Sequence, residues 1–136
     1  MKRNLTIYPL LILCSLAITG CVMVSDGLVN VTDENINVKI VLTTGKVLEF
    51  RVPPHQQVAE RVRFDTPAPR YKSIQAFDDA GLKIGEFSVD QLPNNYTRRY
   101  GKFITIMLTK TGLYPVPKKY FYNPEEHIQE IMEAGR

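Results

Sequence analysis

Two histidines and two pairs of adjacent acids are the first candidates for general acid–base chemistry or for holding a metal ion. They are His55, which follows two prolines, His127 near the C-terminus, Asp78–Asp79 and Glu125–Glu126. The histidines show neither HxH nor HExxH spacing. Asp is favoured in hairpin turns and Glu at the positive end of a helix dipole, so both acid pairs have a structural explanation. We therefore expect surface histidines, no metal site and no catalytic residue.

Motifs for a nucleophile or a cofactor are also missing from the sequence. The chain has no GxSxG motif, no P-loop and no dinucleotide-binding motif. Its two cysteines are Cys14 and Cys21, so residues 22–136 contain no thiol for catalysis, for a disulfide or for a metal. We expect a protein that is not an enzyme and that needs no cofactor.

A cluster of Arg and Tyr is the candidate for partner binding, because planar cations and amphipathic rings are favoured at protein interfaces. The candidate residues are Tyr96, Arg98, Arg99, Tyr100 and Lys102. The alternative is an ordinary solvated loop that leads into a strand. A second stretch, 114–122, holds three Tyr, one Phe, two Pro and two Lys. It is either a partner-binding edge or a strand that covers the core, and we favour the second interpretation.

The N-terminus has the layout of an export signal. Lys2 and Arg3 precede an apolar stretch over 5–18. The stretch ends in Ile18-Thr19-Gly20-Cys21, which resembles the lipobox of bacterial lipoprotein precursors. The resemblance implies that this cysteine is lipidated, that the chain is cut just before it, and that residues 1–20 are removed. An uncleaved membrane anchor and an ordinary secretory signal are the alternatives.

The same resemblance implies a location in the cell envelope, with the membrane as a partner through the lipid anchor. The residue after the lipobox is Val22 and not Asp, which favours the outer membrane, facing the periplasm, if the host is Gram-negative. Loss of Lys2 and Arg3 leaves 15 basic residues (17 − 2) against 14 acidic ones. This near-neutral balance gives no basic field for nucleic acid, so we expect an envelope protein as the further partner and no nucleic acid.

Alternating apolar residues predict the strands that must position these groups. We expect a hairpin over 36–52 and a second hairpin over 71–89, with a turn at Asp78–Gly81. In the second arm of that hairpin Leu82 and Ile84 are expected to share a face, whereas Phe87 is off register by one residue, which predicts a β-bulge near Gly85. Further strands are expected over 28–31, 58–64, 103–109 and 118–122, and a turn over 25–27. The strand over 103–109 has apolar residues on both faces, so we expect it to be central in a sheet or covered on both sides. Asn123 and Pro124 begin a C-terminal helix with an apolar stripe formed by Ile128, Ile131 and Met132.

Short strands at this spacing predict a mainly β fold, an antiparallel β-sandwich of immunoglobulin-like or transthyretin-like topology with a short C-terminal helix. The expected domains are a signal peptide over 1–20, a lipidated tether over 21–27 and a single sandwich over 28–136. One interior is expected to hold Ile40, Phe50, Ile74, Ile84, Ile106 and Leu108.

The expected function is that of a lipid-anchored envelope protein whose small β-domain has a binding, assembly or structural role. An accessory lipoprotein subunit of a secretion or surface complex is the first alternative. An envelope hydrolase is the second, and a deep pocket lined by His55 or by paired carboxylates would favour it.

Overall fold

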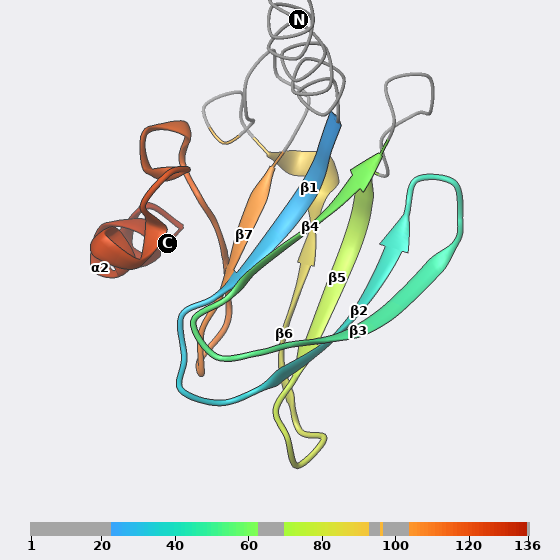
Figure 1. Ribbon diagram of the computed structural model, residues 1–136, viewed down its shortest axis with the longest axis horizontal. Coiled ribbons are helices and arrows are strands. Elements are labelled where there is room, and N and C mark those ends of the chain that lie inside the picture. The colour runs from blue at the N-terminus through green and yellow to red at the C-terminus, as the bar shows by residue number, and fades with distance from the viewer. Residues whose placement is uncertain (1–22, 63–69, 93–95, 97–103, 136) are drawn as a thin grey trace, which may run out of the picture.

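Two four-stranded β-sheets stack face to face, and a short helix lies at the C-terminus. Figure 1 shows the computed structural model, which describes residues 23–62, 70–92, 96 and 104–135. The strands are β1 (Met23–Asn30), β2 (Ile36–Leu42), β3 (Val47–Val52), β4 (Gln57–Val62), β5 (Tyr71–Phe77), β6 (Lys83–Ser88), β7 (Thr105–Leu108) and β8 (Leu113–Pro115). The helical elements are the 3-10 turns η1 (Val89–Gln91), η4 (Lys118–Tyr120) and η5 (Pro124–His127), and the helix α2 (Ile128–Ala134). The predicted mainly β sandwich with a C-terminal helix is confirmed.

The strand order excludes one of the two topologies that the sequence left open. One sheet has the order β4-β1-β7-β8 and the other β3-β2-β5-β6. In an immunoglobulin constant domain, strands 1, 2, 5 and 4 share one sheet, and strands 3, 6 and 7 form the other. The partition here is different, so the immunoglobulin constant-domain arrangement does not fit. Among the described strands all neighbours are antiparallel except β1 and β7, which run parallel from Gly27 opposite Thr105 to Asn30 opposite Leu108.

The first predicted hairpin is confirmed as β2 and β3. Val38, Ile40 and Leu42 alternate with more exposed residues and are buried. The turn closes with a hydrogen bond from the backbone N–H of Leu42 to the carbonyl of Lys46 at 2.8 Å. Gly45 adopts φ +89° in this turn, a left-handed conformation that glycine accepts at no steric cost.

The second predicted hairpin is confirmed as β5 and β6, and so is its bulge. Ala76 lies opposite Gly85 whereas Phe77 lies opposite Lys83, so Ile84 is the additional residue on β6. The bulge turns both Ile84 and Phe87 toward the core. The expectation that Leu82 shares the inward face of Ile84 is wrong: β6 begins at Lys83, and the side chain of Leu82 is 69% exposed.

The main core lies between the sheets. Its buried residues are Leu28, Ile36, Val38, Ile40, Leu42, Val52, Tyr71, Ile74, Ala76, Ile104, Ile106 and Leu108. Four of the predicted core residues are therefore buried there, and the other two, Phe50 and Ile84, are partly buried and pack against it.

A second apolar cluster lies on the other face of the sheet that contains β1 and β7. Its buried residues are Val29, Met107, Val116, Phe121 and Ile131. Residues 116–134, which we call the C-terminal segment, cover this face, and α2 is seen beside β7 in Figure 1. The cover explains why the β7 strand is apolar on both faces, as its sequence predicted. The predicted stripe of Ile128, Ile131 and Met132 packs into this cluster.

Three local predictions need correction. Ser25–Gly27 is not a turn, because these residues lie inside β1, which starts at Met23. Residues 118–122 do not form an edge strand: they contain the η4 turn, and the short strand lies earlier, at Leu113–Pro115. Asn123 does not cap the helix with its side chain, since Pro124–His127 first form a 3-10 turn. In the part of the chain that is described, no helix is long and apolar enough to cross a membrane.

Candidate functional site

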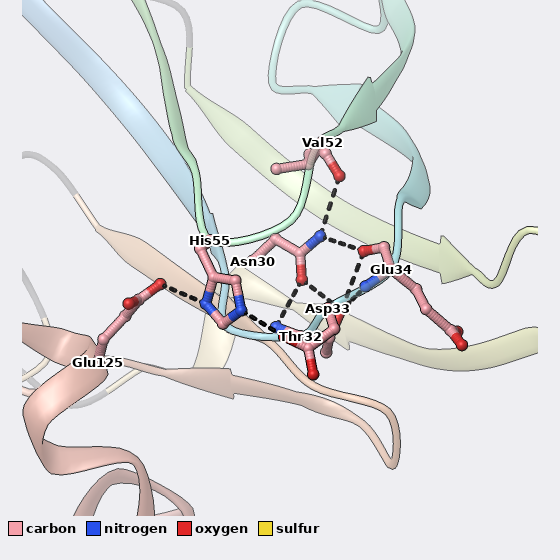
Figure 2. A network of polar contacts seen from close by, with 7 residues as sticks. All are labelled: Asn30, Thr32, Asp33, Glu34, Val52, His55 and Glu125. Atoms are coloured by element: carbon pink, nitrogen blue, oxygen red, sulfur yellow. Dashed lines mark hydrogen bonds and ion pairs between the residues drawn. The ribbon is translucent and has the colours of Figure 1, made fainter.

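His55 lies where three segments far apart in the sequence meet. It follows Pro53 and Pro54 in the connection between β3 and β4, with φ +54°. Its Nε2 lies 2.7 Å from Oδ1 of Asp33, in the β1–β2 connection. Its Nδ1 lies 3.3 Å from Oε1 of Glu125, in η5. Figure 2 shows the imidazole between the two carboxylates, and we call Asp33, His55 and Glu125 the His55 cluster.

A buried asparagine holds the loops that carry this cluster. The side chain of Asn30, at the end of β1, is fully buried. Its Nδ2 donates hydrogen bonds to the carbonyls of Glu34 at 2.7 Å and Val52 at 3.0 Å. Its Oδ1 accepts from the backbone N–H of Thr32 at 2.9 Å and from the Thr32 hydroxyl at 2.7 Å. Asn30 therefore fixes the backbone on both sides of Asp33 and ties it to the strand that leads to His55 (Figure 2).

The electrostatics of the cluster favour a charged ring. The hydrogen bond to Asp33 and the nearby Glu125 carboxylate raise the pKa of His55 above its ordinary value of 6.5. The same hydrogen bond and the positive ring lower the pKa of Asp33 below its ordinary value of 3.8. A protonated imidazole donates from both nitrogens, whereas a neutral one has a single N–H. Two carboxylates, one at each nitrogen, therefore match the imidazolium form.

A cleft of about 320 Å³ lies beside the cluster. Its lining residues are Val29, His55, Gln57, Tyr122, Asn123, Pro124, Glu125 and Glu126. Tyr122, one of these lining residues, is 89% exposed. A general base needs a free nitrogen within reach of its substrate, and carboxylates occupy both nitrogens of His55. The arrangement therefore suits an ion-pair junction and does not suit proton abstraction.

The remaining chemistry candidates have local structural roles. Asp78 closes the β5–β6 turn by accepting hydrogen bonds from the backbone N–H groups of Ala80 and Leu82, each at 2.9 Å. Asp79 forms an ion pair with Arg51 at 2.9 Å. Within the described residues, no group of three or more His, Cys, Asp or Glu side chains is arranged to hold a metal ion.

His127 is held inside the C-terminal segment. Its ring stacks on Tyr120, with 4.4 Å between the ring centroids. Its Nδ1 lies 3.7 Å from Oε1 of Glu130, one turn further along the chain. Its Nε2 lies 3.3 Å from Nδ2 of Asn123. All three partners are close in sequence, so His127 organises the segment that contains it.

Asp26 forms a second polar centre, which the sequence did not reveal. Its carboxylate is fully buried in β1 and accepts hydrogen bonds from the backbone N–H groups of Tyr71 at 2.8 Å and Ile104 at 2.9 Å. Nε of Arg70 lies 3.5 Å from Oδ2. Burial raises the pKa of Asp26, and these hydrogen bonds and Arg70 oppose the rise. The carboxylate joins β1 to the start of β5 in the opposite sheet and to the residue before β7.

The proposed partner-binding cluster is described only at Tyr96. This residue is 9% exposed, and its hydroxyl donates a hydrogen bond to the carbonyl of Ala134 at 2.8 Å. Tyr96 thus fastens the end of α2 and does not present its ring to a partner, contrary to expectation. The other candidates, Arg98, Arg99, Tyr100 and Lys102, lie outside the described residues, as does Cys21.

The aromatic residues of the stretch 114–122 cover the core with one exception, although residues 118–120 form a 3-10 turn and not the strand that was favoured. Phe121 is buried in the second cluster, and Tyr114 and Tyr120 are partly buried against it. Tyr122 is the exception, because it points to solvent at the cleft.

Sequence reasoning placed His55 and Glu125 separately on the surface and missed their contact. The two residues are 70 positions apart, and no local pattern joins them. Comparison with known proteins adds no further assignment: no protein-family model, no curated protein and no solved structure matches the chain.

Proposed function

We propose that the chain is a lipid-anchored bacterial envelope protein whose β-sandwich is held directly at the membrane and has a binding or assembly role there. The observation that carries the proposal is the position of Met23. It begins β1 only two residues after Cys21, the residue whose lipidation the lipobox implies. Two extended residues span at most about 7 Å. A domain attached through them has almost no freedom to move away from the lipid surface.

The position of β1 in the fold supports the same idea. β1 is not an edge strand, because it lies between β4 and β7. An anchor at its start therefore holds the centre of a sheet. Such an attachment suits a protein that keeps a partner at a fixed height and orientation, and it does not suit one that searches a wide volume on a flexible linker.

The opposite end of the sandwich is then the surface that faces away from the membrane. β1 has eight residues, which corresponds to a length of about 26 Å. Its last residue, Asn30, adjoins the His55 cluster and the cleft with Tyr122. The connections 31–35, 53–56, 78–82 and 109–112 also lie at this end, which we call the distal end (Figure 1). We propose that the envelope partner contacts the distal end.

Two alternatives remain distinct from this proposal. An accessory subunit of a secretion or surface complex would have the same anchor, and its larger assembly would be recovered with it. A hydrolase would use the cleft, which does contain His55 and the Glu125–Glu126 pair. The engagement of both His55 nitrogens by carboxylates argues against that use.

The anchor is tested by fractionation and by mass spectrometry of the native N-terminus. We expect the mature chain to begin with a diacylglyceryl-modified Cys21, and the Cys21→Ser variant to leave the membrane fraction. Recovery of a chain that still begins with Met1, or a Cys21→Ser variant that stays in the membrane, would support the uncleaved anchor instead.

The short attachment is tested by inserting a flexible spacer of about 15 Gly and Ser residues after Val22. Such a spacer adds a typical reach of roughly 20 Å. Lipidation and the melting temperature should stay the same, whereas site-specific crosslinking from the distal end to envelope partners should fall. A spacer variant of equal length in the exposed Thr43–Lys46 turn controls for insertion as such. Unchanged crosslinking after the Val22 insertion would contradict the positioning role but not the lipid anchor.

A further inference from the structure

Among the described contacts, three that involve side chains fasten the C-terminal segment to the sandwich. Its apolar side chains fill the second cluster, with Ile131 fully buried. The carbonyl of Ala134, at the end of α2, accepts the hydrogen bond from Tyr96. In the middle of the segment, Glu125 reaches His55. The contact to His55 is the one of these three that depends on protonation.

We propose that His55 is a pH-sensitive latch that fastens the C-terminal segment onto the distal end of the sandwich when its ring is protonated, and that loosens the segment when the ring becomes neutral. The inference concerns a conformational device and does not depend on the lipid anchor proposed above.

The charges around the ring explain why its protonation matters. Asp33 faces one nitrogen from the β1–β2 connection, and Glu125 faces the other from η5. Glu126 lines the same cleft, and Lys110 from the β7–β8 connection acts on Asp33. A positive ring is attracted to both carboxylates. With a neutral ring, Asp33 and Glu125 are like charges on either side of it, and only one nitrogen still carries a proton to donate.

The backbone of His55 has a left-handed conformation, with φ +54°. Asparagine, aspartate and histidine are the residues with a Cβ that are enriched in this region, so asparagine is a conservative replacement for His55. The Asn30 network holds this connection in place, since the backbone N–H of Asn30 donates to the carbonyl of Gln56 at 2.9 Å.

The C-terminal segment is suited to respond. α2 has seven residues, and a helix this short is not stable without packing against the rest of the fold. Because the contacts at His55 are solvent-exposed, we expect the latch to change the population of loosened segment modestly, by about twofold to fivefold.

The pH interval follows from the two shifted groups. Because the pKa of His55 is raised, the stabilisation of the closed latch by His55 is complete below the ordinary value of 6.5 and is lost as the pH rises through the raised pKa. Because the pKa of Asp33 is lowered, the stabilisation by Asp33 is complete above its ordinary value of 3.8 and is lost as the pH falls through the lowered pKa. The latch is therefore closed in mildly acidic solution and opens on the alkaline side of the His55 titration.

The test uses the full chain in detergent micelles, studied by NMR between pH 5 and 9. The chain has two histidines, so the ring signals are few, and the His127→Gln variant identifies those of His55. We expect His55 to titrate above 6.5. The hydrogen-exchange rates of the α2 amides, corrected for the intrinsic effect of pH, should rise about twofold to fivefold, with the same midpoint as the His55 titration. We call this rise the step in α2 exchange.

Variants separate the latch from a general effect of pH. His55→Asn suits the left-handed backbone and does not titrate, so the step in α2 exchange should disappear and the rate should stay at the high-pH level of the wild type. Glu125→Gln, an exposed change at the other partner, should act in the same way and keeps the test intact if His55→Asn fails to fold. His127→Gln should retain the step. A wild-type chain without the step, or a step that survives in both His55→Asn and Glu125→Gln, would overturn the proposal.

Discussion

Replacing Asp26 by Ala should remove the carboxylate that ties β1 to the beginnings of β5 and β7. The backbone N–H groups of Tyr71 and Ile104 would lose the oxygens that accept their hydrogen bonds, at sites where both residues are buried. A buried donor that loses its acceptor costs about 1–3 kcal/mol. Two such losses give a decrease in the free energy of unfolding of about 2–6 kcal/mol.

Asp26→Asn is the matched control for this change. Its single amide oxygen is able to accept one of the two hydrogen bonds, and its NH₂ group faces the other donor. We therefore expect about half the effect, roughly 1–3 kcal/mol. The assay is urea denaturation of the full chain in detergent, followed by circular dichroism, with the midpoint and the slope fitted separately. A cost below about 0.5 kcal/mol for Asp26→Ala, typical of a surface change, would refute the account of Asp26 as the link between the sheets.

The pH dependence of the same variants gives a second measurement. Burial raises the pKa of Asp26, so the folded state binds a proton at this group more readily than the unfolded state does. The contribution of this titration to stability is therefore present below the ordinary value of 3.8 and is lost as the pH rises through the raised value. Because asparagine does not titrate, the stability of the wild type relative to Asp26→Asn should increase as the pH falls. A constant difference between the two proteins would mean that the Asp26 carboxylate titrates alike in the folded and unfolded chains.

Three further predictions concern stability. Ile106→Ala removes a fully buried side chain from the main core and should lower the free energy of unfolding in denaturant by about 2–5 kcal/mol. Leu82→Ala changes a residue that is 69% exposed and should lower it by under about 0.5 kcal/mol. Equal effects of the two variants would contradict the inward orientation of Ile106 in β7. Gly45→Ala places a Cβ on a residue with φ +89°, and the backbone strain should lower the free energy of unfolding by roughly 1–2 kcal/mol. No atom lies within 4 Å of that Cβ, so a clash makes no contribution, and a neutral result would show that the turn relaxes. A chain that starts at Val22 has no thiol, and its melting temperature should be the same with and without reductant; a shift would point to an effect other than disulfide reduction.

Much of the β structure could be predicted because its signals are local. The alternation of apolar and polar residues over 36–52 and 71–89 identified both hairpins, because side chains alternate between the two faces of a strand and short turns join the arms. The structure shows the corresponding alternation of buried and more exposed residues in β2 and β5. The off-register Phe87 revealed the bulge at Gly85 for the same reason. The apolar residues on both faces of β7 also showed in advance that this strand is covered on both sides.

The failed predictions share a different cause. Ser25–Gly27 has turn composition, but Gly27 pairs with Ala59 of β4 and with Thr105 of β7, and this pairing makes the segment a strand. The stretch 118–122 has aromatic residues typical of strands, yet residues 118–120 form a 3-10 turn, and Phe121 directly after it fills the second cluster. In both cases contacts between segments far apart in the sequence outweighed local propensity.

By itself the sequence determined the class of fold, the positions of the hairpins and the lipobox-like motif at Cys21, because each of these depends on residues that are neighbours along the chain. Only the tertiary structure decided the parallel pairing of β1 with β7, which joins residues 27–30 to 105–108. It also decided the burial of Asp26 and the meeting of Asp33, His55 and Glu125. These contacts depend on how two sheets stack and where the C-terminal segment packs, and such choices are made by the free energy of the whole domain, which no local pattern records.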